Sequence, residues 1–108
     1  MMKTVSAPEL AHWLADGARA KPLLLDVREP WEFDRCRLNG AALVPMRELP
    51  ARLGDVEADG PIVCICHHGG RSAHAAMFLL RQGFADVYNL TGGVDAWARQ
   101  VDPTMPTY

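Results

Sequence analysis

The chain has 108 residues, enough for one compact domain and too few for a second hydrophobic core. Hydrophobic residues make up 49% and charged residues 22% of the chain, as in ordinary globular proteins, and the net charge of -2 gives no general attraction to nucleic acid or to an anionic membrane. Because three cysteines do not suggest a disulfide framework, and neither a membrane span nor a signal-peptide pattern is present, we expect a reduced, cytoplasmic protein. A chain of this size is compatible with a monomer.

The first predicted unit is a short strand followed by a helix. Residues 3–5 are the strand candidate, and residues 6–9, Ser-Ala-Pro-Glu, form a capping box that starts the helix. Gly17 suits the end of that helix. The residues predicted to share its apolar face are Leu10, Trp13 and Leu14.

A second strand is predicted at residues 22–27, whose apolar run is typical of burial on both faces of a sheet. Asp26 and Arg28 stand at its carboxyl end, where charged groups need partners. Two interpretations stay open for them, support of a neighbouring functional loop or a plain structural ion pair. A short helix is predicted from residue 30, with Glu32 on its open side.

The middle of the chain has weaker signals. Residues 43–44 are predicted as a strand, and residues 46–53 as a helix interrupted by Pro50. Cys36 is either a spare cysteine or a resolving thiol for a reactive cysteine elsewhere.

Residues 62–65 are an uninterrupted apolar run, which predicts a strand buried on both faces. The run ends at Cys66, and a helix is predicted to begin at or just before Arg71. A thiol is therefore placed at the carboxyl end of a strand, where open α/β sheets bind their ligands. The N-terminal N–H groups of a helix beside a thiol favour the nucleophilic thiolate.

The loop that follows Cys66 has residue types that suit an anionic sulfur or an oxyanion. Gly69 and Gly70 permit positive φ angles, so that successive N–H groups can point at one spot. Arg71 offers a planar fork of donors for a sulfonate, phosphate or carboxylate. His67 and His68 titrate near neutrality, where they add charge or relay a proton. The alternative is a buried structural cysteine beside polar turn residues.

The last third of the chain completes an alternating pattern. Residues 72–81 predict a heavily buried helix that Gly83 caps, and residues 86–90 predict the last strand. Residues 91–93 turn into a final helix, and the prolines of residues 101–108 indicate a surface tail. Strands that alternate with helices predict an α/β fold with one parallel sheet and helices on both faces.

Three motifs in order resemble the rhodanese-like sulfurtransferases. They are residues 24–33 (LLDVREPWEF), 66–72 (CHHGGRS) and 92–97 (GGVDAW). The resemblance covers roughly residues 4–108 and is closest to the rhodanese domains at the C-terminus of sulfur-carrier adenylyltransferases, which tend to end in a tyrosine. It implies a single rhodanese-like domain over residues 1–108, with a short start at 1–3 and a surface tail at about 101–108. The family usually has Gly-His where Cys36 and Arg37 stand here, so no role is expected for a histidine in that loop.

The resemblance implies a sulfurtransferase of the thiosulfate:cyanide type. Cys66 would take sulfane sulfur from thiosulfate or a persulfide donor, hold it as a persulfide, and pass it to a thiol or a sulfur-carrier protein. The backbone of the loop would stabilise the sulfur, and Asp26, Arg28 and Trp97 would act as supports. The residues expected to bind substrate are His67, His68, Gly69, Gly70, Arg71 and Ser72. No cofactor or metal is expected beyond the covalent persulfide, and no nucleic acid or membrane partner.

Three other functions compete with this one. Thiol phosphatases and arsenate reductases use Cys-x5-Arg, whereas only four residues separate Cys66 from Arg71 here, which favours a sulfur atom over a phosphoryl group. A zinc site is disfavoured because no second spaced pair of ligands closes a tetrahedral shell. Its candidate ligands are Cys64, Cys66, His67, His68 and His74. A sulfur carrier or docking module with little thiosulfate turnover remains the alternative from another class.

Overall fold

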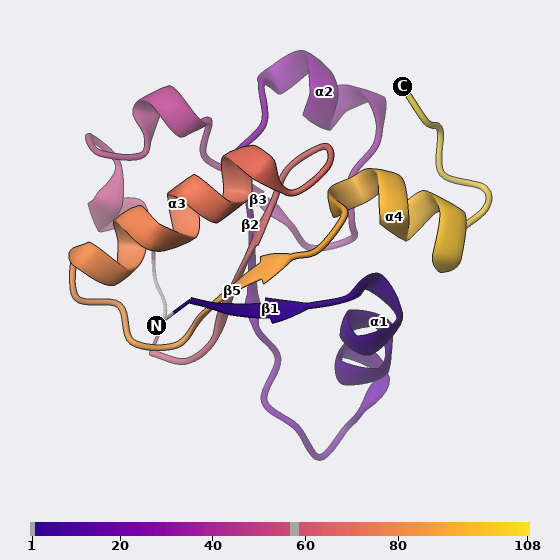
Figure 1. Cartoon of the computed structure of the whole chain (residues 1–108), viewed down its shortest axis with the longest axis horizontal. Helices are drawn as coiled ribbons and strands as arrows, with labels where there is room; N and C mark the ends of the chain where they lie inside the picture. The colour runs from indigo at the N-terminus through magenta and orange to yellow at the C-terminus, as the bar shows by residue number, and fades with distance from the viewer. Residues whose placement is uncertain (1, 57–58) are drawn as a thin grey trace.

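The computed structural model describes residues 2–56 and 59–108, which form one parallel five-stranded sheet with helices on both faces (Figure 1). The sheet order is β1-β5-β4-β2-β3. The strands are β1 (Lys3–Val5), β2 (Leu23–Asp26), β3 (Ala42–Leu43), β4 (Ile62–Ile65) and β5 (Val87–Leu90). The helices are α1 (Ala7–Ala15), α2 (Pro30–Arg35), α3 (Gly70–Arg81) and α4 (Gly93–Gln100), with short 3-10 turns η1 (Met46–Glu48) and η2 (Leu53–Asp55). The predicted α/β fold is confirmed, and none of these helices is long and apolar enough to cross a membrane.

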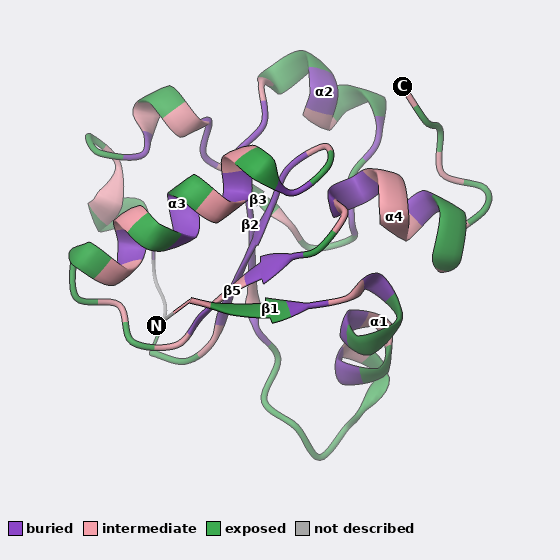
Figure 2. Ribbon diagram, viewed as in Figure 1, coloured by how far each residue is buried: buried purple, intermediate pink, exposed green. Residues whose placement is uncertain are grey.

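Strand β4 lies at the centre of the sheet, between β2 and β5. Ile62 and Cys64 belong to the core layer that includes α3, whereas Val63 and Ile65 belong to the layer that includes α1 and α4. Figure 2 shows the inner faces of these helices buried against the sheet. This alternation explains why the strand is apolar at every position, because both of its faces are covered.

The helix boundaries follow from local capping chemistry. At the start of α1, Ser6 Oγ accepts from the Glu9 N–H at 3.2 Å and the Glu9 carboxylate accepts from the Ser6 N–H at 2.8 Å, which is the predicted capping box. Helix α1 ends at Ala15, so that Gly17 lies just beyond its cap. At the end of α3, Gly83 adopts a φ of +100°, and the two residues after the cap donate back to the last turn, as in a Schellman motif.

Two expectations about the middle of the chain are corrected. Residues 46–53 do not form one interrupted helix, because η1 and η2 are separate 3-10 turns on either side of Pro50, a residue that has no N–H to continue a helix. Strand β3 comprises residues 42–43 instead of 43–44, and it pairs with β2 at the sheet edge.

Candidate active site

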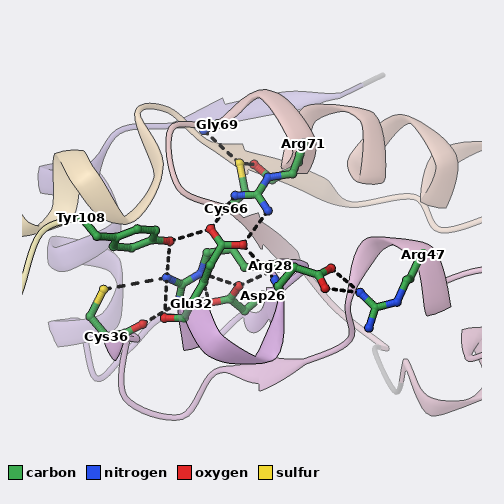
Figure 3. Close-up of polar contacts among 11 residues, drawn as sticks. Asp26, Arg28, Glu32, Cys36, Arg47, Cys66, Gly69, Arg71 and Tyr108 are labelled. Carbon is green, nitrogen blue, oxygen red and sulfur yellow. Dashed lines mark hydrogen bonds and ion pairs between the residues drawn. The ribbon is translucent and has the colours of Figure 1, made fainter. Parts of the chain in front are cut away.

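The site is built around Cys66, which directly follows β4 at the carboxyl edge of the sheet. Its side chain is 1% exposed, and the backbone N–H of Gly69 donates to Sγ at 3.0 Å (Figure 3). The hydroxyl oxygen of Ser72 lies 3.2 Å from the same sulfur. Gly69 adopts a φ of +107°, a left-handed conformation that turns the chain over the sulfur and into α3. The loop therefore places a helix start, a backbone N–H donor and a hydroxyl group beside one thiol.

The first turn of helix α4 is hydrogen-bonded to this loop. The N–H of Val94 donates to the Cys66 carbonyl at 2.9 Å, and the N–H of Asp95 donates to the His67 carbonyl at 3.1 Å. Gly93 makes this contact possible, because a Cβ at its position would lie 2.3 Å from the carbonyl oxygen of Cys66 and 2.4 Å from that of His67. Gly93, the second of the late glycine pair, is thus explained by close backbone approach to the thiol loop, whereas a Cβ on Gly92 would lie 2.6 Å from the Cβ of Ala96.

Asn89, from β5, is a site residue that the sequence did not single out. Its amide nitrogen donates to the Gly69 carbonyl at 3.0 Å, and its amide oxygen lies 2.5 Å from Ser72 Oγ. The side chain therefore connects both groups that contact the Cys66 sulfur. A polar residue in an otherwise buried strand is the signal that would have identified it.

Glu32 is buried, and the expectation that it lies on the open side of its helix is wrong. Its carboxylate accepts from both terminal nitrogens of Arg71, at 2.7 and 2.8 Å, and from the Glu29 N–H at 3.0 Å. These contacts bring the inner face of α2 to the thiol loop. The hydrogen bonds from Arg71, opposed by burial and assisted by the Glu29 N–H and the Tyr108 hydroxyl, lower the Glu32 pKa to about 2. Arg71 thus lies beside the loop with its guanidinium on a carboxylate.

The tail brings Tyr108 into the site, which no local sequence pattern indicates. Its ring stacks on His67 with centroids 3.9 Å apart, and Trp31 packs against it edge-on. Its hydroxyl donates to Glu32 at 2.9 Å and accepts from Arg28 at 2.8 Å. Burial, which outweighs the effect of Arg28, raises the Tyr108 pKa to about 12, so the phenol stays protonated and able to donate.

Asp26 and Arg28 form an ion pair whose two side chains are fully buried, with Nη2 of Arg28 2.7 Å from the carboxylate. The guanidinium also donates to the carbonyls of Glu32, at 3.2 Å, and Cys36, at 2.6 Å. Burial lowers the Arg28 pKa, but hydrogen bonds to Asp26 and to Tyr108 overcome that effect and raise it. The pair therefore links the carboxyl end of β2 to α2 and to Tyr108.

The two loop histidines stack on each other, with ring centroids 3.8 Å apart. Burial, together with the adjacent His68, lowers the His67 pKa, and Nε2 of His67 is buried without a hydrogen-bond partner among the described residues. Ligand atoms of His67, His68 and Asp95 lie within 4.8 Å of one another, which is the one group in the described ranges that could hold a metal ion. Asp95 also accepts from Arg99 at 2.9 Å, so its carboxylate already has a partner.

The remaining predicted residues make no hydrogen bond to the Cys66 sulfur within the described part of the chain. Cys64 is in the core layer beneath α3, where burial and the neighbouring Cys66 raise its pKa to about 12, so it stays a neutral thiol and a poor metal ligand. His74 is exposed on α3, and Trp97 packs against the opposite core layer. Cys36 is buried, with its sulfur 3.8 Å from the guanidinium of Arg28.

Fold and site together define a class of protein, a parallel α/β domain that presents a buried thiol inside a loop of hydrogen-bond donors at its carboxyl edge. The family model that matches is the rhodanese-like domain, over residues 6–100, and the chain belongs to this family.

Several known proteins are similar to the chain over most of its length. It is 35% identical to a protein named sulfurtransferase from Allochromatium vinosum, covering 97% of this chain and 96% of that one. It is 37% identical to the probable adenylyltransferase/sulfurtransferase MoeZ of Mycobacterium tuberculosis, covering 97% of this chain. The crystal structure of a rhodanese-like domain protein from Staphylococcus aureus has a TM-score of 0.83 and 27% identity, with 99% of both chains covered.

Some relatives are much longer than this chain. It spans 27% of the length of MoeZ and 30% of a rhodanese-like/PpiC domain-containing protein from Arabidopsis thaliana. The domain thus occurs in proteins that carry other domains as well as in proteins of its own size.

Proposed function

We propose that the protein is a sulfurtransferase that moves sulfane sulfur through a persulfide on Cys66. The observation that carries the proposal is the environment of the sulfur, where the Gly69 N–H and the Ser72 hydroxyl converge on Sγ at 3.0 and 3.2 Å. Such donors stabilise a negatively charged sulfur before and after it carries a second sulfur atom. The relatives named sulfurtransferase support the same activity.

The reaction has two half-steps, each of which breaks one sulfur–sulfur bond and forms a new bond to the transferred sulfur atom. In the first, the Cys66 thiolate attacks the outer sulfur of thiosulfate or of a thiol persulfide, and sulfite or a thiolate leaves with the electron pair of the broken bond. In the second, an acceptor thiolate or cyanide attacks the outer sulfur on Cys66, and the electron pair returns to the Cys66 sulfur. Splitting the transfer through a covalent intermediate predicts ping-pong kinetics.

A sulfur carrier or docking module that hands sulfur between proteins is the second candidate. It is favoured by the relatives in which this domain is only part of a longer chain. The two candidates differ in turnover, because a carrier accepts sulfur from a protein donor but releases little of it to small acceptors. A phosphatase is less well supported, because the loop folds tightly onto the sulfur and has one residue fewer than Cys-x5-Arg.

The test is the intact mass of the protein after incubation with thiosulfate or with glutathione persulfide. We expect a gain of one sulfur atom, about 32 Da, which cyanide or a thiol removes. Cys66→Ser should lose the adduct, whereas Cys36→Ser, which removes another buried thiol, should keep it. If the protein gains no sulfur from either donor, or Cys66→Ser still gains it, the proposal is wrong.

A further inference from the structure

The carboxylate of Glu32 is placed to control the charge that a sulfur donor meets at the loop. The Glu32 side chain is 5% exposed, and it receives both terminal nitrogens of Arg71, the Tyr108 hydroxyl and the Glu29 N–H, all within 3.0 Å. Four donors on two oxygens is a nearly complete set for a carboxylate. Glu32 is therefore a fixed negative charge, held in place from α2, α3 and the tail (Figure 3).

Arg71 is correspondingly committed to Glu32. A bidentate pair uses the fork geometry with which a guanidinium would otherwise bind a sulfonate or a phosphate. The Arg71 side chain is nevertheless 42% exposed, so it has room to turn toward a ligand once the carboxylate releases it. An anionic donor must compete with a buried, well-bonded carboxylate for this cation.

Arg28 and His67, which lie at the same edge of the sheet, offer little further positive charge to a donor. Arg28, the second guanidinium beside the loop, is buried and paired with Asp26. His67 is held toward its neutral form by burial and by the adjacent His68, which lower its pKa. The loop therefore offers the Gly69 N–H and the Ser72 O–H to the donor. The positive charge of Arg71, beside the loop, is already neutralised by Glu32.

We propose that Glu32 is a positioning residue that sets the class of sulfur donor, favouring thiol persulfides over thiosulfate by holding Arg71 away from the donor's anionic group. This inference rests on the proposed sulfur transfer. Thiosulfate brings two negative charges to the thiolate and expels sulfite, whereas a protonated thiol persulfide, R–S–SH, brings none at its reacting end. In that case the Cys66 thiolate bonds to the outer sulfur, the sulfur–sulfur bond of R–S–SH breaks, and R–S⁻ leaves with the electron pair. The dipoles of the loop are sufficient for this second donor.

Glu32→Gln tests the inference without dismantling the helix start. Glutamine also suits this capping-box position and can still accept from Arg71 and Tyr108, but it carries no charge. We expect the ratio of kcat/KM for thiosulfate to kcat/KM for glutathione persulfide to rise about tenfold or more, the gain expected from one newly available charged hydrogen-bond pair. The rise should come mainly from a lower KM for thiosulfate.

Two further variants show whether the gain comes from Arg71. In the double variant Glu32→Gln/Arg71→Met the thiosulfate-to-persulfide ratio of kcat/KM should return to the wild-type value, because the variant has no Arg71 guanidinium that could bind the donor. Glu48→Gln removes an equally charged side chain from η1, where it pairs with the partly exposed Arg52, and should leave the ratio within about twofold of wild type.

The outcomes separate this inference from the proposed function. If wild type forms the Cys66 adduct but the donor ratio of Glu32→Gln stays within about twofold of wild type, Glu32 does not set donor class and sulfur transfer stands. The same conclusion follows if the double variant keeps the gain. If wild type accepts sulfur from neither donor, both proposals fall.

Discussion

Gly93 is the position where one methyl group should do most damage to the site. In Gly93→Ala the new Cβ would lie 2.3 Å from a backbone carbonyl oxygen, and alanine would have to adopt a φ of +61°. The left-handed conformation costs about 1–2 kcal/mol. Relief of the clash requires α4 to move off the loop, which breaks the hydrogen bonds from Val94 and Asp95 to Cys66 and His67 and adds about 1 kcal/mol for each. We expect a total loss of about 3–4 kcal/mol.

Urea and thermal unfolding measure this loss. At about 4 °C per kcal/mol for a domain of this size, the Tm should fall by about 12–16 °C. Gly40→Ala is a matched control, because Gly40 has a φ of +81° and no atom within 4 Å of its added Cβ, so that it isolates the left-handed cost. Gly17→Ala, with open space and no positive φ, should be nearly neutral. If Gly93→Ala were no worse than Gly40→Ala, the close approach of α4 would not constrain the loop.

Three further predictions concern side chains around the sulfur. Asp26→Asn leaves the buried Arg28 guanidinium without a carboxylate and should lower the free energy of unfolding by about 3–5 kcal/mol, measured in urea. Ser72→Ala removes the hydroxyl 3.2 Å from the Cys66 sulfur and should lower kcat/KM for sulfur transfer about tenfold or more, since a hydrogen bond to a charged group contributes about 1.5–3 kcal/mol. The Glu32 pKa is about 2 in the fold against 4.5 for the free group. The ionised carboxylate therefore stabilises the fold fully above pH 4.5, and this contribution is lost as the pH falls through 2. The stability advantage of wild type over Glu32→Gln should therefore shrink by about 1–2 kcal/mol between about pH 6 and about pH 3 in urea unfolding, after allowance for the exposure of Arg71.

Each of these has an outcome that contradicts it. An Asp26→Asn variant as stable as wild type would mean that Arg28 finds another anion or reaches water. If Ser72→Ala left the transfer rate unchanged, the Ser72 hydroxyl would donate its hydrogen bond to the Asn89 amide oxygen, 2.5 Å away, and not to the sulfur. A stability difference between wild type and Glu32→Gln that does not depend on pH would show that the charge of Glu32 is not stabilised by the fold.

The sequence predicts the central part of the site because its signals are local. The apolar run of β4, the glycines after Cys66 and the start of α3 follow one another within residues 62–81, and each has a direct structural cause. Strands β1, β2 and β5 are similarly located by short apolar runs, with boundaries within two residues of those expected. The interrupted helix at residues 46–53 fails because 3-10 turns have no distinctive periodicity.

The parts that the sequence does not predict depend on contacts between distant segments. Helix α2 has six residues, too few for periodicity to identify its inner face, and the partner that buries Glu32 is 39 residues away. Tyr108 lies in an aperiodic tail, and its hydroxyl meets Glu32 across 76 residues. Asn89 occupies a strand position whose side-chain partners lie on another element. For all three, the chemistry is visible in the sequence but the neighbour is not.

The pairing of β1 with β5 joins the first and the last strand of the sheet in sequence order, so the sheet is completed only after β5 has been translated. On a ribosome β1 emerges first and stays unpaired until the opposite end of the domain has been made, since its partner in the sheet is β5. The Cys66 carbonyl in turn waits for the N–H groups of α4, which are translated still later. From the translation of Cys66 until α4 has been made, a nascent chain therefore carries its thiol without the contacts that hold the thiol loop in the finished fold.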